Sequence, residues 1–184
     1  YKSLRLQQES EKNNEVDTPI VIDPKMEAIV EQMFKRCFDD LCFEQAIGIA
    51  LDTRRIDLLE ETCKLAIANG KDSLLGYTFN LCVEARNITS REFRASVMEI
   101  LTKLYRTLSV PDYSNMCFAL QFLNRPSDVA SVLFELLQSN DQTHALTAYQ
   151  IAFDLTETEN QGFIMNTMQH FNALLSTNSQ SSST

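Results

Sequence analysis

The chain has 184 residues, of which 16 are Lys or Arg and 25 are Asp or Glu, so its formal net charge is −9. Phosphate binding needs clustered Lys and Arg, so this balance disfavours nucleic acid as a partner. The composition includes four Gly, four Pro and no Trp, and it favours helices over sheets. The longest apolar run, residues 46–51, is far below the roughly 20 residues that a membrane-spanning helix needs.

Residues 1–22 are predicted to be a flexible polar lead-in, because the stretch 7–18 is charge-rich and holds a single apolar residue. The first residue is Tyr and no charged-then-apolar leader follows it, so we expect a piece of a longer protein. Asp23 and Pro24 then form a typical helix start, an N-cap followed by proline at the first helical position.

The first two predicted helices, 25–38 and 42–53, form an antiparallel hairpin. In the first helix the apolar residues recur with alternating spacings of three and one, which places them in one stripe. The second helix carries Ala46, Gly48 and Ala50, small residues that let a neighbouring backbone approach closely. A single hairpin cannot bury its own stripe, so it needs another hairpin beside it.

Further helices are predicted along the rest of the chain, at 56–69, 72–87, 90–108, 111–123, 126–138, 142–156 and 159–175. Hairpin starts near 25, 56, 91 and 126 recur about every 31 to 35 residues, the length of one helix–turn–helix unit. The predicted fold is therefore all-α: a rod-like α-solenoid of about nine helices over residues 23–175. The consensus of tetratricopeptide repeats is missing. Residues 176–184 contain no apolar side chain, and we expect a disordered Ser-rich linker there.

Two segments carry a resemblance to a known family. Arg36-Cys37, followed by the run Gln-Ala-Ile-Gly-Ile-Ala-Leu-Asp-Thr-Arg-Arg-Ile-Asp at 45–57, resembles the amino-terminal helical region of the largest non-ATPase scaffold subunit of the proteasome regulatory particle. The run Ala-Tyr-Gln-Ile-Ala-Phe-Asp-Leu at 148–155 is similar to a second segment of that subunit, in the right order. The resemblance extends more weakly over 23–175, and it implies a scaffold and transfers no catalytic residue. In that family the following region forms a toroid of proteasome/cyclosome repeats.

Sequence motifs for chemistry are nearly absent. The five cysteines, Cys37, Cys42, Cys63, Cys82 and Cys117, lack a Cys-x-x-Cys pair and are interpreted as buried thiols in a reducing compartment. His144 and His170 have no metal-ligand spacing around them. The phenylalanines are interpreted as core rather than as a peptide groove. We therefore predict no catalytic, cofactor-binding or metal-binding residue, no cofactor and no small-molecule substrate.

Charge gives the best clue to partners. No Lys or Arg follows Arg125, whereas six acidic residues do. This acidic third is interpreted either as a solvated face or as a docking surface for a basic partner. The pair Arg54-Arg55 is interpreted as making ion pairs or capping a helix, with anion binding as the alternative. The candidate partner surface consists of Arg54, Arg55, Asp141, Asp154, Glu157 and Glu159.

Two functions follow as hypotheses. The first is a non-catalytic scaffold segment of the proteasome regulatory particle, located in cytoplasm and nucleus, whose partners are other lid and base subunits in ubiquitin-dependent protein degradation. The second is a free-standing helical-repeat adaptor that binds short peptides on a concave groove. Neither membrane nor nucleic acid is an expected partner.

Overall fold

The computed structural model describes residues 1–12, 22–84, 90–139 and 141–181. These ranges hold ten helices and no strand, so the predicted all-α class is confirmed. The helices are α1 (Lys2–Lys12), α2 (Pro24–Asp39), α3 (Phe43–Thr53), α4 (Ile56–Ala68), α5 (Ser73–Glu84), α6 (Arg91–Thr107), α7 (Tyr113–Phe122), α8 (Pro126–Gln138), α9 (Gln142–Glu157) and α10 (Gln161–Ser181). None of these described helices is long and apolar enough to pass through a lipid bilayer.

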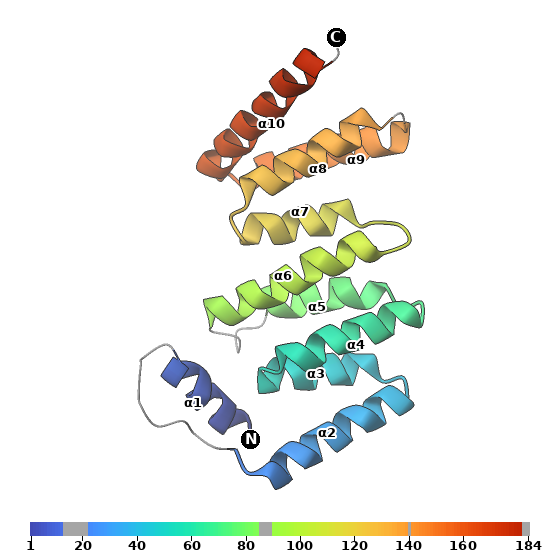
Figure 1. Ribbon diagram of the computed structural model, residues 1–184, viewed down its shortest axis with the longest axis vertical. Helices are drawn as coiled ribbons and strands as arrows, with labels where there is room; N and C mark the ends of the chain where they lie inside the picture. Colours follow the sequence, from blue (N-terminus) through green and yellow to red (C-terminus); the bar gives the residue numbers. More distant parts are fainter. Residues whose placement is uncertain (13–21, 85–89, 140, 182–184) are drawn as a thin grey trace. The chain divides into compact units, whose positions relative to one another are not determined.

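The chain divides into two compact units, residues 1–97 (unit 1) and residues 98–184 (unit 2), and the division falls inside α6. Within unit 1, α2 packs against α3 and α4 against α5, and within unit 2, α7 and α9 both pack against α8, with short turns between these neighbours (Figure 1). The starts of α2, α4, α6 and α8 match the predicted hairpin starts closely. This repeated pairing is the organisation of an α-solenoid.

Unit 1 is built around α3, which contacts α1, α2, α4 and α5. Its residues Ala46, Ile47 and Ala50 are completely buried. The two alanines therefore allow the predicted close approach between helices. Gly48 differs, because a Cβ placed on it would meet nothing within 4 Å. It lies on a face that no neighbouring element approaches.

The predicted stripe of α2 is only partly covered in unit 1. Val30 and Phe34 are buried, but Ile29 and Met33 remain 59% and 44% exposed. The start of this helix follows the predicted chemistry, because the Asp23 carboxylate accepts a hydrogen bond from the Lys25 N–H at 2.9 Å.

Helix α1 lies where a flexible lead-in was expected, and this part of the prediction was wrong for Lys2–Lys12. Its sequence offers only two leucines as apolar residues, and two ion pairs join the helix to α2 and α3. The Lys2 ammonium lies 2.8 Å from the Asp52 carboxylate, and the Arg5 guanidinium pairs with Glu27. Both partners are distant in sequence, so local patterning gives no sign of them. Residues 13–21 of the expected lead-in lie outside the described residues.

Unit 2 contains α7 to α10 and the second part of α6. Helix α8 contacts α7, α9 and α10, and α7 also contacts α9. The α6 stripe is buried from Ile100 to Tyr105 on the predicted side. Helix α7 begins at Tyr113 rather than at Pro111, because the Asp112 carboxylate accepts a hydrogen bond from the Asn115 N–H at 3.0 Å and fixes the N-cap there.

The Ser-rich tail also differs from expectation, because α10 continues through residue 181. The hydroxyl of Ser176 donates to the Asn172 carbonyl at 2.9 Å, and the hydroxyl of Thr177 donates to the Leu174 carbonyl at 2.9 Å. Such bonds to the preceding turn keep hydroxyl residues compatible with a helix. The last three residues of the predicted linker lie outside the described part of the chain.

Several helices end in a residue with positive φ that is not glycine. These residues are Leu41, Arg54, Asn124 and Glu159, with φ between 54° and 58°. Gly70, with φ 70°, follows α4 in the same role, at the Asn-Gly stop that the sequence suggests.

Candidate partner-binding surface

Arg54 is the residue that follows α3, and its side chain packs inside unit 1. Its backbone is left-handed, and its N–H donates to the Ala50 carbonyl, which gives it the role of a helix C-cap. The guanidinium carbon lies 4.4 Å from the centroid of the buried Phe93 ring. This is a cation–π contact within the unit.

Arg55 is the centre of an ion-pair cluster. Its guanidinium Nη2 lies 2.6 Å from Asp57 Oδ2 and its Nε lies 2.9 Å from Asp57 Oδ1, a two-point pairing. Its Nη1 lies 3.5 Å from Glu27 Oε1 and donates to the Tyr1 hydroxyl at 3.3 Å. The hydrogen bond to Asp57 raises the pKa of Arg55, and the same bond lowers the pKa of Asp57.

These contacts bear on the two interpretations of the arginine pair. The Arg55 side chain is 13% exposed, and it forms ion pairs with carboxylates of its own unit. Arg54 is half-buried at the C-cap. The geometry therefore supports internal ion pairing and capping, and it does not support Arg54 and Arg55 as a surface for an anionic partner.

The four acidic candidates all belong to unit 2 but do not form one patch. Asp141 is the N-cap of α9; its carboxylate accepts a hydrogen bond from the Thr143 N–H at 2.9 Å, which lowers the pKa of Asp141. Asp154 and Glu157 lie at the other end of this helix, about 20 Å away at 1.5 Å per residue. Asp154 and Glu157 share a face three residues apart, and the exposed Glu159 follows directly after the helix.

Helix α9 has two apolar faces, which the sequence analysis did not recognise. Ala148, Ile151 and Leu155 are buried against the unit. A second series with spacings of three and four remains outside, with exposures of 60%, 58% and 68%: Leu146, Tyr149 and Phe153. A helix that is apolar on two faces has two surfaces to cover. The presence of two apolar stripes on one helix is the sequence signal that could have indicated this exposed apolar face.

The outer face of α9 borders a groove of about 260 Å³ between α8, α9 and α10, here called the α8–α10 groove. Its lining includes Leu133 and Leu137 of α8, Tyr149 and Ala152 of α9, and Met168 and Phe171 of α10. Of these, Tyr149 and Met168 are 58% and 57% exposed. Monomeric proteins seldom leave a contiguous apolar surface of this kind open without a binding role.

An acidic side chain lies near the exposed ring of Phe153 on α9. Phe153 and Glu157 are one helical turn apart, so the carboxylate lies on the same side of α9 as the exposed ring. No basic residue follows Arg125 in the sequence. An apolar groove in a region whose charged residues are all acidic fits an amphipathic helix whose apolar stripe is flanked by Lys or Arg.

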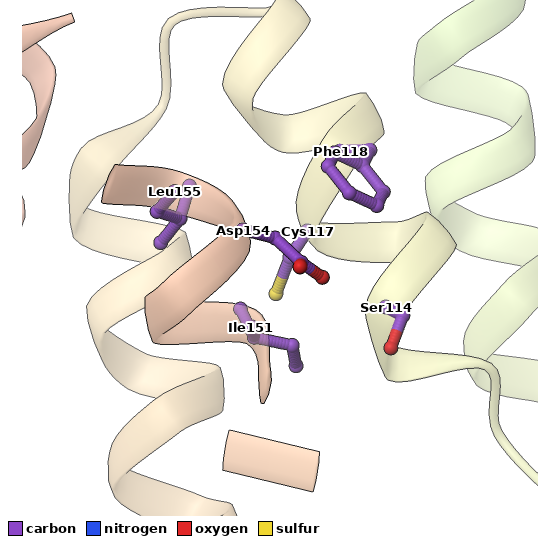
Figure 2. A pocket seen from close by; sticks show the side chains of 6 residues that line it. All are labelled: Ser114, Cys117, Phe118, Ile151, Asp154 and Leu155. Carbon is purple, nitrogen blue, oxygen red and sulfur yellow. The ribbon is translucent and has the colours of Figure 1, made fainter. Parts of the chain in front are cut away.

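A second depression in unit 2 shows why its polar residues are unsuited to nucleophilic chemistry. Figure 2 shows the six lining residues from α7 and α9: Ser114, Cys117, Phe118, Ile151, Asp154 and Leu155. Burial raises the pKa of the Cys117 thiol to about 12, so the sulfur stays protonated at neutral pH. The Asp154 carboxylate instead accepts a hydrogen bond from the Gln150 amide at 2.7 Å.

The two histidines occupy separate environments in unit 2. His144 Nδ1 lies 2.9 Å from the Ser139 hydroxyl, and its ring meets Tyr113 edge-on at 6.0 Å between centroids. His170 is exposed on α10. In the described ranges, no group of three or more His, Cys, Asp or Glu side chains is arranged to hold a metal ion.

The phenylalanines interpreted as core are buried or half-buried, whereas two of the five cysteines expected to be buried are not. Phe34 and Phe43 are buried, and Phe38, Phe79, Phe118 and Phe122 are half-buried. Cys63, Cys82 and Cys117 are buried, Cys37 is half-buried and Cys42 is exposed. Cys42 lies in the turn between α2 and α3, where no helix covers it.

Comparison with known proteins places these features in a family. Residues 2–183 match the family described as 26S proteasome subunit RPN2, N-terminal domain. The chain is 47% identical over 152 residues to 26S proteasome non-ATPase regulatory subunit 1 of Drosophila melanogaster, covering 82% of this chain and 14% of that protein. It is 42% identical over 165 residues to 26S proteasome non-ATPase regulatory subunit 1 homolog A of Arabidopsis thaliana, covering 90% and 16%.

A more distant relative extends the same match. The 26S proteasome regulatory subunit RPN2 of Saccharomyces cerevisiae is 27% identical over 154 residues, covering 82% of this chain and 16% of that protein. The chain thus spans about one-sixth of the length of the relatives that it matches. The resemblance noted from the sequence is confirmed, and the chain belongs to the family of the N-terminal domain of 26S proteasome subunit RPN2.

Proposed function

We propose that this chain is a non-catalytic scaffold segment of the proteasome regulatory particle, which holds other subunits together in ubiquitin-dependent protein degradation. The observation that carries the proposal is the exposed apolar α8–α10 groove. The names of the relatives, which are regulatory and non-ATPase subunits of the 26S proteasome, support the same assignment. The peptide-adaptor alternative has no comparable support.

The groove supplies contact area of the kind that subunit interfaces use. Tyr149, Phe153 and Met168 are all more than half exposed. Burying one such side chain contributes about 1.5–3 kcal/mol before ordering costs are subtracted. Tyr149 and Met168 in the groove lining, with Phe153 one helical turn from Tyr149 on α9, therefore suffice as anchors for a partner helix.

The proposed partners are lid or base subunits that present a helix with an apolar stripe and basic flanks. The acidic residues after Arg125 would attract such a helix and disfavour acidic competitors. The proposed locations are those of proteasomes, the cytoplasm and the nucleus. The proposal includes no catalytic residue, no cofactor and no small-molecule substrate for this chain.

Zero-length carbodiimide crosslinking with a purified, salt-dissociated regulatory particle tests the proposal. Amine-reactive crosslinkers would report poorly on this surface, because residues 126–184 contain no lysine. Carboxylate-to-lysine coupling at Glu157 or Glu159 would instead identify the partner residue by mass spectrometry. We expect crosslinks from these positions to lysines of a regulatory-particle subunit.

Two variants of equal charge separate the groove from general acidity. Tyr149→Glu with Met168→Glu places two carboxylates in the groove lining and should reduce crosslinking at least about tenfold, because both anchors are lost. Asn166→Glu with Gln169→Glu adds the same charge to exposed positions outside the groove lining and should leave crosslinking unchanged. Equal crosslinking by both variants, or crosslinks only to proteins outside the particle, would argue against the proposal.

A further inference from the structure

The turn between α2 and α3 brings two cysteines together. Leu41 has φ 54°, and its N–H donates to the Phe38 carbonyl at 3.2 Å. The Cys42 N–H donates to the Cys37 carbonyl at 2.8 Å. These two bonds define a Schellman motif, in which the residue two positions beyond the cap and the third-last helical residue are side-chain neighbours. In this chain those two residues are Cys42 and Cys37.

The backbone bond limits how far apart the two residues lie. With 2.8 Å between Cys42 N and Cys37 O, standard bond lengths keep the two Cα atoms within about 6.7 Å of each other. Disulfides join residues whose Cα atoms are about 4.4–6.8 Å apart. The turn therefore holds these cysteines at a bridgeable separation without any need to unwind α2.

The two thiols differ in accessibility. Cys42 is exposed, and its Sγ lies 3.5 Å from the Asp40 carbonyl oxygen. Cys37 is half-buried, and burial raises the pKa of its thiol, with Cys42 and Asp40 adding to the effect. Since a thiolate is the attacking species, an external reagent meets Cys42 first and Cys37 responds second.

The surroundings of Cys42 admit a small reagent. An open depression of about 270 Å³ is lined by Cys42, Phe43, Lys71 and neighbouring residues. The Lys71 ammonium donates to the Leu41 carbonyl at 3.0 Å and lies 5.1 Å from the Phe43 ring centroid. A cation is thus placed between the residues on either side of Cys42, and it favours the approach of an anionic reagent.

The remaining cysteines are poorly suited to this chemistry. Burial raises the pKa of Cys63 and Cys82 to about 11 and that of Cys117 to about 12. All three are buried inside their units. An oxidant acting on the folded chain is therefore directed to the α2–α3 turn.

We propose that Cys37 and Cys42 form an oxidation-sensitive dithiol, which a low-molecular-weight disulfide such as glutathione disulfide converts into an intramolecular disulfide. The Cys42 thiolate attacks one sulfur of glutathione disulfide, forms a mixed disulfide and releases one glutathione thiolate. The Cys37 thiolate then attacks Cys42 Sγ and expels the second glutathione. One glutathione disulfide is reduced to two glutathione molecules, and two protein thiols become one disulfide.

The experiment uses the whole chain and glutathione disulfide as the probe. After oxidation and alkylation, trypsin releases Cys37 and Cys42 in one peptide, because no Lys or Arg lies between Arg36 and Arg54. We expect this peptide to lose two hydrogens and escape alkylation, at a rate at least about tenfold above any modification of Cys63, Cys82 or Cys117. Dithiothreitol should restore alkylation of both residues.

Two single variants test the order of events. Cys37→Ser should stop at a stable mixed disulfide between Cys42 and glutathione, visible as one added glutathione. Cys42→Ser should remain unmodified at Cys37 over the same time. Neither position is in the core, and circular dichroism checks that both variants are folded. Bridges to buried cysteines, intermolecular dimers as the main product, or no mixed disulfide in Cys37→Ser would overturn the proposal.

Discussion

Unit 1 pairs its charges internally, whereas unit 2 leaves much of its charge and apolar surface for contact with something else. In unit 1, Arg55 joins Asp57 and Glu27, and Lys2 reaches Asp52 from a distant part of the sequence. In unit 2, all six charged residues after Arg125 are acidic, and the α8–α10 groove is open beside them. Two units of similar length and helix content therefore differ in their surfaces. Unit 1 has ion pairs between its own helices, and unit 2 has an exposed apolar groove.

The largest expected difference in the free energy of unfolding is between alanine variants of one phenylalanine in each unit. Phe34→Ala in unit 1 removes a ring that is 1% exposed and should lower the free energy of unfolding by about 3–5 kcal/mol. Phe153→Ala in unit 2 removes a ring that is 68% exposed and should change it by less than about 0.5 kcal/mol. Urea unfolding followed by circular dichroism measures both. A large loss with Phe153→Ala would show that the outer apolar face of α9 belongs to the core and is not a binding surface.

The next effect compares one ion pair from each unit. Arg55→Ala should destabilise by about 1–2 kcal/mol, because a side chain that is 13% exposed loses two carboxylate partners and its packing. Arg125→Ala breaks a pair with Glu99 in which both side chains are nearly half exposed, and it should cost about 0–0.5 kcal/mol. Equal losses in the same unfolding assay would remove the contrast between internal and surface pairing.

The smallest effect is a pH dependence in unit 1. The hydrogen bond from Arg55 lowers the pKa of Asp57 below its ordinary value of 3.8. The carboxylate therefore stabilises the fold above about pH 3.8, and this stabilisation is lost as pH falls through the lower folded-state pKa. We expect Asp57→Asn to lower the urea midpoint slightly at neutral pH.

The same measurement at acid pH gives the check. Asp57 is largely exposed, so the difference from the unaltered chain should be about 0.5 kcal/mol and should close below about pH 3.8. The isosteric amide keeps the shape of the side chain, so packing is the same in both proteins. A difference that persists unchanged at low pH would mean that the charge on Asp57 is not the cause.

Local signals in the sequence were sufficient for most of the helix boundaries. Asp23 with Pro24, the Ser90 hydroxyl that accepts from the Phe93 N–H at 3.2 Å, and Pro126 all mark helix starts in the structure as predicted. These signals act over three or four residues, so they are visible without tertiary information. Helix α1 depends instead on ion pairs with Asp52 and Glu27, which no local pattern reveals.

The candidate surface was predicted only in part, for a similar reason. The acidic character of the region after Arg125 can be read directly from the sequence, because no Lys or Arg follows that residue. Asp57 lies two residues from Arg55 in the sequence, whereas Glu27, its second carboxylate partner, is brought to it only by the fold. The outer apolar residues of α9, among them Phe153, have the same spacing as its core residues, so periodicity alone cannot say which face is covered.

The left-handed residues that end several helices also bear on how far the chain can be stabilised. Leu41, Arg54 and Glu159 have Cβ atoms in a conformation that is unfavourable for L-residues. Glu159 is exposed, so glycine at this position would relieve that strain without removing a core contact. The net gain should be about 0.5–1 kcal/mol, since glycine also loses more chain entropy on folding. An engineer seeking a higher melting temperature would therefore begin at the helix ends and leave the packed helices untouched.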